Sequence, residues 1–237
     1  MKMRGFEEER QWITNEFEEA VFDTSTGLSA EELYSQLQEL QRASAGRPRQ
    51  LVCAEAYAWL LDHVQLELNL HTPFSVKINI GVDYSGFASG DVFDRALFRV
   101  QRKEVLEQLY PKELQRMLEG DAIGLGEIWT DFWHTVPDWE DILQLGFAGL
   151  LKRAEAAREN WINREDRQES QILFLDSVII CFRAIIRLLE RIYRYSLQFD
   201  APEFSACIEK LIHRPPETLY EVMQLSVFYL YMEEIGC

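Results

Sequence analysis

The sequence contains few cysteines and few basic residues, and both shortages narrow what the protein can be. Only four of its 237 residues are cysteines, at positions 53, 181, 207 and 237. They lie far apart and form no C-x-x-C pair, so we expect free thiols in a reducing compartment. Lysine and arginine together number 24, aspartate and glutamate 40, and the formal net charge is −16. Because so acidic a chain repels a phosphate backbone, we expect no nucleic-acid partner.

Long uncharged hydrophobic runs are also missing. The most apolar stretch, residues 172–195, is interrupted by charged side chains at positions 176, 183, 187, 190, 191 and 194. A bilayer span tolerates far fewer charges. The first nine residues turn acidic after a basic tip and lack the apolar core of a signal peptide. We therefore expect no membrane partner and a cytoplasmic location.

The compact motifs of several enzyme classes are absent as well. The sequence has neither a G-x-S-x-G nucleophile elbow nor an H-E-x-x-H zinc pair, so hydrolase and metalloprotease functions lack support. The glycines of residues 81–90 lack the strand and helix context of a dinucleotide motif, and no P-loop lysine accompanies them. We expect no metal or cofactor bound by this chain. A weaker interpretation is that the 81–90 loop lines a substrate entrance.

Helical periodicity runs through most of the sequence and predicts a mainly α fold. Hydrophobic residues make up 47% of the chain and charged residues 27%, which is typical of a globular protein. Ser29 and Glu32 have the spacing of a capping box, and Asn163 is placed to cap a very long helix. The expected helices cover residues 6–21, 30–40, 49–70, 91–110, 138–160, 163–199, 202–213 and 217 onward.

Residues 71–90 differ in character from the helical regions on either side. Val76, Ile78, Ile80 and Val82 alternate with other residues, which predicts a short strand, and glycines make residues 84–90 loop-like. The sequence therefore predicts one helical domain over residues 1–237, with one short strand and loop segment near 74–90. A sub-boundary at 71–90 is possible.

The last predicted helix is apolar on nearly every side. Its hydrophobic residues are Leu219, Val222, Met223, Leu225, Val227, Phe228, Leu230, Tyr231 and Ile235. A helix of this kind is usually buried all round. We interpret it as a sign that the chain is the front part of something larger, and an oligomeric interface is the competing interpretation.

Three segments in the second half of the chain carry a family resemblance. Residues 131–146 read D-F-W-H-T-V-P-D-W-E-D-I-L-Q-L-G, residues 194–196 read R-Y-S, and residues 215–224 read P-P-E-T-L-Y-E-V-M-Q. In this order they resemble motifs of the glycyl radical enzymes, the family of pyruvate formate-lyase and of glycerol and choline lyases. Val222 replaces the usual small alanine, and the R-x-x-E-L that usually precedes the double proline is absent, so a distant subfamily is expected.

The resemblance implies a role within a larger protein. Family members have an α/β barrel wrapped by helices, a thiyl-forming cysteine inside it and a glycyl radical loop near the C-terminus. These elements lie beyond the region that resembles this chain, and Cys237 follows the last motif too closely to match the thiyl cysteine. The expected function is therefore the helical N-terminal portion of a glycyl radical enzyme, which supplies outer helices and one pocket wall and is inactive alone.

The family chemistry implies further partners. It is radical cleavage of a C–C, C–O or C–N bond in a small polar substrate, with the radical installed by an S-adenosylmethionine-dependent activase. This makes a substrate, an activase and a homodimeric partner the expected partners of the full enzyme. The alternative is a stand-alone helical interaction or scaffold protein that forms a homodimer. A weaker third interpretation is an unrelated helical small-molecule binder.

His134 is the candidate catalytic and substrate-binding residue, with Asp131 beside it in the substrate-binding set. In the hydro-lyase members of the family a polar side chain on this helical part faces the substrate, so the resemblance implies that a histidine here serves as an acid or base. A neighbouring carboxylate can orient a histidine or raise its pKa. The competing interpretation is a histidine hydrogen-bonded to backbone, with Asp138 serving a helix N-terminus. We expect His63, His71 and His213 to be structural or surface residues.

Four arginines fall on one face of the long predicted helix, at Arg183, Arg187, Arg191 and Arg194. They are consistent with a surface for an anionic substrate or partner. The favoured interpretation is a solvated face paired with Glu190 and with the excess carboxylates of the chain.

Overall fold

The computed structural model describes residues 5–8, 10–11, 22–68, 76–79, 111–112, 115–116 and 137–236. Its elements are α2 (Ala30–Ala43), α3 (Arg49–His63), β1 (Gln65–Leu68), β2 (Val76–Asn79), α7 (Trp139–Ile162), α8 (Glu169–Ser196), α9 (Pro202–His213) and α10 (Leu219–Gly236). The predicted mainly α fold class is confirmed. The predicted helices over 6–21 and 91–110 fall largely or wholly outside the described residues.

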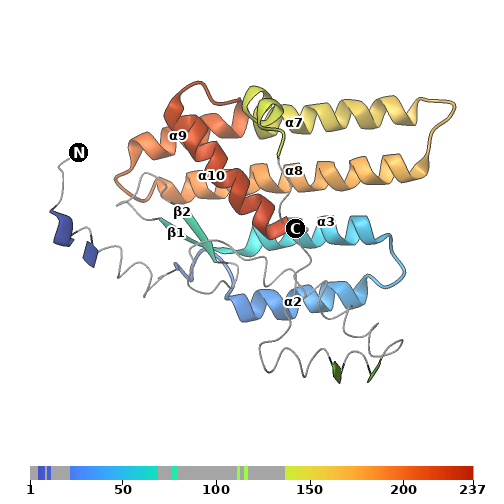
Figure 1. Ribbon diagram of the computed structural model, residues 1–237, viewed down its shortest axis with the longest axis horizontal. Coiled ribbons are helices and arrows are strands. Elements are labelled where there is room, and N and C mark those ends of the chain that lie inside the picture. Colours follow the sequence, from blue (N-terminus) through green and yellow to red (C-terminus); the bar gives the residue numbers. More distant parts are fainter. Residues whose placement is uncertain are drawn as a thin grey trace.

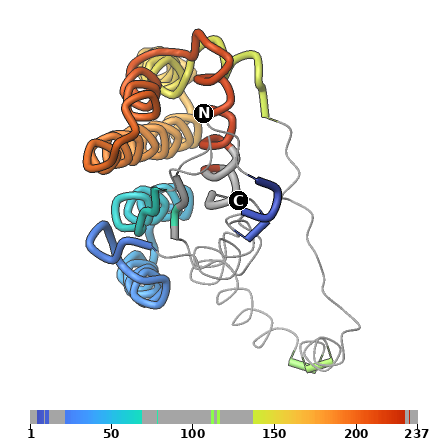
Figure 2. Tube along the Cα trace, turned by 90° about the vertical axis from the view of Figure 1, so that its left-hand side faces the viewer, coloured from blue at the N-terminus to red at the C-terminus, as the bar shows by residue number. Residues whose placement is uncertain are grey.

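The long helices lie in stacked rows, and α10 crosses them. Figure 1 shows α7 above α8, α8 above α3 and α3 above α2, and Figure 2 shows the same order from the side. Helix α8 is central because it packs against α3, α7 and α9. Its buried residues include Ala184, Leu188 and Ile192, which recur every four residues along one face. The hydrophobic core therefore forms around α8.

The α7–α8 connection differs from the prediction. Asn163 does not begin a helix, because it is the C-cap of α7 and α8 begins only at Glu169. Residues 163–170 are all polar and all exposed, so a helix there has no apolar face to bury. The turn forms its own local contacts, with Arg164 paired to Asp166 at 2.6 Å and stacked over the Trp161 ring.

The predicted helix over 49–70 is shorter than expected. Helix α3 ends at His63, and the chain continues as β1, which pairs antiparallel with β2. The 23–28 segment fixes this change of direction, because the Leu28 amide donates to the His63 carbonyl at 2.8 Å. Gly27 is required beside it, since a Cβ there would lie 2.3 Å from the same carbonyl oxygen. The predicted strand is present over 76–79, and residues 80–90 lie outside the described ranges.

The arginines of α8 reach across to other elements. Two of them pair with carboxylates, as the favoured interpretation expected, but these carboxylates belong to α3 and α7 and Glu190 is not the partner. Arg187 forms a two-bond ion pair with Asp62 of α3, and Arg183 pairs with Glu155 of α7. Arg191 donates to the carbonyl oxygens of Leu61, Thr26 and Val64, the last two at 2.7 and 2.8 Å. The Arg191 guanidinium therefore caps the C-terminal end of α3 and joins it to the 23–28 segment.

Helix α10 is covered on one side by the chain itself. Leu225, Phe228 and Met232 are buried, and α10 packs against α9 and α7. The Tyr57 hydroxyl of α3 donates to the Met232 carbonyl at 3.2 Å. On another side Leu219 is 75% exposed and Met223 40% exposed. Among the α10 residues whose burial is described, the expected open apolar flank is therefore present at Leu219 and Met223.

None of the helices in the described part of the chain combines the length and the hydrophobicity needed to cross a membrane.

Replacing Arg191 with methionine is expected to destabilise the protein. The change keeps much of the side-chain volume but leaves three partly buried carbonyl oxygens without their donor, so we expect a loss of about 2–3 kcal/mol in the free energy of unfolding. The measurement is urea unfolding followed by circular dichroism. Arg194→Met is the matched control, because Arg194 is exposed on the same helix, and its effect should stay below about 0.5 kcal/mol. Equal effects of the two changes would contradict the capping role.

Candidate functional site

The structure describes only part of the three sequence motifs. His134 and Asp131, the predicted site residues, lie outside the described residues. The described parts are residues 137–146, 194–196 and 215–224. They come from α7, α8 and the junction between α9 and α10. These described parts form the helical structure that adjoins the predicted site.

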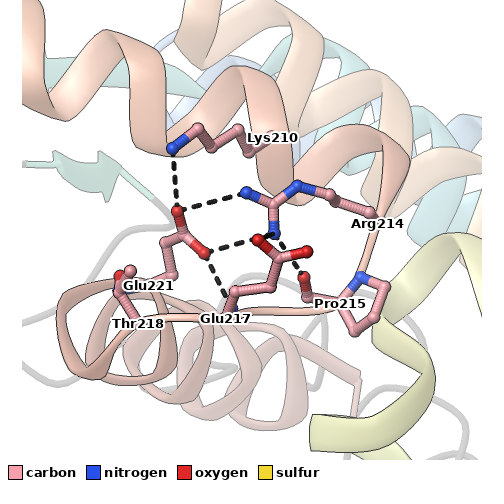
Figure 3. A network of polar contacts seen from close by, with 6 residues as sticks. All are labelled: Lys210, Arg214, Pro215, Glu217, Thr218 and Glu221. Atoms are coloured by element: carbon pink, nitrogen blue, oxygen red, sulfur yellow. Dashed lines mark hydrogen bonds and ion pairs between the residues drawn. The ribbon is translucent and has the colours of Figure 1, made fainter.

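Glu221 is a buried carboxylate at the centre of a polar network at the α9–α10 junction (Figure 3). Its side chain is only 3% exposed. Its Oε1 accepts from Lys210 at 3.2 Å, and its Oε2 accepts from the backbone amide of Glu217 at 2.8 Å. Arg214 contacts both oxygens, at 3.4 and 3.5 Å, and also donates to the Pro215 carbonyl at 3.0 Å. The buried carboxylate is thus satisfied by two cations and a backbone donor.

Local sequence explains how this network forms. Pro215 and Pro216 cannot continue α9 as a helix, so the chain turns there. The Thr218 hydroxyl then accepts from the Glu221 amide at 3.2 Å, which starts the next helix as an N-cap does. Lys210 lies in the last turn of α9, and Arg214 is the C-cap residue with an extended backbone, so the end of the helix brings both cations to Glu221. Sequence reasoning did not single out these two cations, although two basic residues just before a double proline were a readable signal.

The network sets the ionisation of its members. The backbone amide of Glu217 and then the Lys210 and Arg214 cations lower the pKa of Glu221 below its usual value. Burial, reinforced by the Glu221 charge, raises the pKa of the Cys207 thiol to about 12. Cys207 is therefore a protonated, inert thiol in this network, because the thiolate is the reactive form.

Gly146 joins the first motif to the third. It has φ 60° and ψ 178° within α7, which breaks the helix into a short arm, 139–145, and a longer rod. A Cβ at Gly146 would lie 3.1 Å from the Pro215 Cα and 3.3 Å from the Arg214 carbonyl oxygen. Only glycine combines this backbone conformation with so close an approach. The bend in α7 and the α9–α10 junction therefore fit against one another.

The short arm of α7 is also held at its start. The Asp138 side chain accepts from the Asp141 amide at 3.2 Å, which confirms its predicted service to a helix N-terminus. The Trp139 ring lies against the Tyr229 ring of α10, with centroids 5.2 Å apart. Pro137 directly precedes the capping residue Asp138, and His134 lies three residues before Pro137 in the sequence. The described arm thus fixes the place at which the candidate segment joins the helical support.

The second motif connects α8 to α9 and to the 23–28 segment. The Ser196 hydroxyl is buried and lies 2.7 Å from the Ser205 hydroxyl of α9. Burial, followed by the neighbouring Asp23 carboxylate, raises the pKa of Tyr195 to about 12. A phenol with such a pKa stays protonated at physiological pH. The described residues of this motif hold helices together.

The remaining candidate residues have structural roles or lie elsewhere. The His63 Nδ1 lies 2.7 Å from the Trp59 carbonyl oxygen, and its ring stacks on the Trp59 ring. His213 is exposed, and His71 lies outside the described residues. Among the residues that the structure describes, no group of three or more His, Cys, Asp or Glu side chains could hold a metal ion. Two surface hollows, of about 170 and 340 Å³, are lined by none of Gly146, Pro215 and Glu221.

Comparison with known proteins confirms the family resemblance seen in the sequence. Residues 94–233 match a family model described as pyruvate formate lyase-like. A glycyl radical enzyme from Archaeoglobus fulgidus has a similar fold, with a TM-score of 0.65 and 14% sequence identity over 94% of this chain. The glycerol-bound B12-independent glycerol dehydratase from Clostridium butyricum gives a TM-score of 0.56 and 18% identity over 91% of this chain.

The structural matches cover nearly all of this chain but only a part of each enzyme. This chain covers 33% of the archaeal enzyme and 35% of the glycerol dehydratase, so it spans about a third of their lengths. A search of curated protein sequences gave no significant match.

Replacing Gly146 with alanine should separate conformational strain from close packing. The new Cβ would meet both a positive φ and the Pro215 backbone, so we expect a loss of about 2–4 kcal/mol in the free energy of unfolding. Gly46→Ala is the matched control, because Gly46 has φ 81° with open space around it, and its cost should be about 1 kcal/mol. Urea unfolding measures both values. If the two losses were the same, the fit between Gly146 and Pro215 would contribute nothing.

The Glu221 network predicts a specific pH dependence. Because the folded-state pKa of Glu221 lies below its unfolded value of 4.5, its contribution is complete above that value and is lost as the pH falls through the folded pKa. Glu221→Gln should therefore cost about 2–3 kcal/mol at pH 7. The difference from the wild type should shrink as the pH falls below about 4.5. The measurement is denaturant unfolding at low protein concentration from pH 7 to pH 3.5, and a constant difference over this range would contradict the charged network.

Proposed function

Because this chain belongs to the pyruvate formate lyase-like family, we propose that it is the helical N-terminal portion of a glycyl radical enzyme. In this proposal it supplies outer helices and one wall of the substrate pocket, and it is inactive alone. The observation that carries the proposal is the extent of the structural matches. Nearly the whole chain matches about a third of each enzyme, so most of such an enzyme lies outside this third.

The described junction suits the role of a supporting wall. Gly146, the Pro215 turn and the buried Glu221 carboxylate lock α7, α9 and α10 together through close packing and satisfied charges. A rigid element is the better support for a functional side chain, because reacting groups must be held to within a fraction of an ångström. His134 precedes the capped start of α7 by a few residues. We assign to it proton transfer or hydrogen bonding to the substrate, with Asp131 as its polar neighbour.

The proposed reaction is the breaking of a C–C, C–O or C–N bond in a small polar substrate. A glycyl radical, installed by an S-adenosylmethionine-dependent activase, supplies the hydrogen-atom chemistry when the complete enzyme is active. No residue of this chain is assigned to carry that radical. The proposed enzyme acts in the cytoplasm as a homodimer.

A stand-alone homodimeric interaction protein is the alternative, and one observation favours it. The exposed Leu219 and Met223 give α10 an apolar flank that a second copy would shield. Sedimentation of the purified chain tests this alternative. The alternative expects a dimer with no need for further polypeptide, and a soluble monomer would count against it.

The direct test of the favoured proposal is the coding sequence after the codon for Cys237. We expect it to continue into barrel strands, a thiyl-forming cysteine and a glycine loop. The purified 237-residue chain, treated with activase and S-adenosylmethionine, should give no glycyl radical signal in electron paramagnetic resonance, whereas the longer product should give one. A reading frame that stops at that codon, with no separate polypeptide that restores the signal, would reject the proposal.

In the longer enzyme, His134→Gln is expected to lower kcat by about 100-fold or more, because positioned acid–base groups contribute about 10²–10⁴-fold. Turnover is measured on pyruvate, glycerol and choline, and the pH dependence of kcat is recorded for the substrate that reacts. His213→Gln is the control, since His213 is exposed on α9, and it should leave kcat unchanged. An unchanged kcat and pH profile in the His134 variant would assign this histidine to structure alone.

A further inference from the structure

Two of the cysteines lie on helices that pack directly against each other. Cys53 is on α3 and Cys181 is on α8, and both side chains are half-buried. The α2–α3 turn and the α7–α8 turn lie at the same end of the molecule, so α3 and α8 run in the same direction (Figure 1). Residues at a constant sequence separation therefore lie at the same level of the two helices.

The contacts between α3 and α8 give that separation. Asp62 and Arg187 are 125 residues apart, Val64 and Arg191 are 127 apart, and Leu61 and Arg191 are 130 apart. Cys53 and Cys181 are 128 residues apart, which falls within this range. The register of the helices thus brings the two cysteines to about the same level, with Cys53 nine residues before Asp62 and Cys181 six residues before Arg187.

The ionisation of Cys181 also responds to Cys53. Burial raises the pKa of Cys181 to about 11, and the charge of the Cys53 thiolate adds to the increase. Because such a charge effect weakens with distance, it agrees with the placement of the two cysteines at about one level of adjoining helices. Cys207 makes no such contribution to Cys181, and it belongs to the Glu221 network instead.

Cys53 is open to small reagents. It lines a surface hollow of about 170 Å³ at the α2–α3 turn, together with Gln41 and Ser44. Cys207, by contrast, is only 3% exposed. An external reagent therefore reaches Cys53 more readily than Cys207.

We propose that Cys53 and Cys181 form a dithiol pair that a low-molecular-weight disulfide oxidises to a disulfide linking α3 to α8. The Cys53 thiolate attacks one sulfur of oxidised glutathione, forms a mixed disulfide and releases one glutathione thiolate. The Cys181 thiolate then attacks the Cys53 sulfur and releases the second glutathione thiolate. Overall the protein loses two protons and two electrons, and one oxidised glutathione becomes two reduced glutathione molecules. This modification site is independent of the radical function proposed above.

The order of steps makes a kinetic prediction. Since Cys181 must ionise before it attacks, and its pKa is about 11, the second step should be slow near neutral pH. Its rate should rise about tenfold for each pH unit below that pKa. The mixed disulfide on Cys53 should therefore accumulate at pH 7 and convert to the internal disulfide as the pH is raised to 9.

The experiment incubates the folded full chain with oxidised glutathione and follows its intact mass. The chain carries Cys207→Ser and Cys237→Ser, which leave only the proposed pair. We expect a glutathione adduct at pH 7 and a product about 2 Da lighter than the reduced chain at pH 9, and dithiothreitol should reverse both. Peptide mapping of the wild-type chain should locate the same Cys53–Cys181 link, which guards against a variant that fails to fold.

Two single changes complete the test. Cys181→Ser should keep the adduct at every pH, and Cys53→Ser should form no internal disulfide and at least tenfold less adduct at pH 7. An adduct on Cys53 of the unsubstituted pair that persists at pH 9 without closing would overturn the proposal. So would an internal link that forms only in urea, because the two thiols would then meet only in the unfolded chain.

Discussion

Burial of the apolar face of α8 is the constraint on which the rest of this structure depends. The helix has 28 residues, and its buried side chains contact three other helices. Fully burying a leucine or isoleucine side chain stabilises a fold by about 1.5–3 kcal/mol. Leu188, Leu189 and Ile192 are each no more than 2% exposed, so this helix alone contributes several such increments. The positions of α3, α7 and α9 follow from the need to cover it.

The arginines of α8 add directional contacts to the hydrophobic effect, which has no preferred direction. Hydrophobic burial alone would allow α3 to slide along α8. The bidentate Arg187–Asp62 pair and the three carbonyl contacts of Arg191 hold one register. Exposed ion pairs contribute little to stability, yet a planar guanidinium with fixed partners is well suited to choose among arrangements of similar stability. The same register places Cys53 level with Cys181, so specificity and the proposed redox chemistry have one origin.

Sequence patterns predicted the features that depend only on neighbouring residues in the chain. The capping box at Ser29 and Glu32 is present as expected, with the Ser29 amide 2.8 Å from the Glu32 carboxylate. The cap at Asp138 is also present, because a short polar side chain before an apolar helix acts within three residues. The failures concern long-range contacts. The end of α3 at His63 is set by pairing with residues 23–28, and no helical periodicity within 49–70 reports on that segment.

The candidate site divides in the same way. The family motifs could be identified from the sequence alone. The structural role of their residues could not, because it depends on contacts between residues that are far apart in the sequence. Gly146 makes sense only beside Pro215, 69 residues later in the chain, and Glu221 only beside Lys210 and Arg214. A buried carboxylate without its cations would be strongly destabilising, so the α10 start, the α9 end and the α7 bend must be retained together. The first and third motifs therefore act as parts of one support, and His134 is predicted to depend on both although it belongs to only the first.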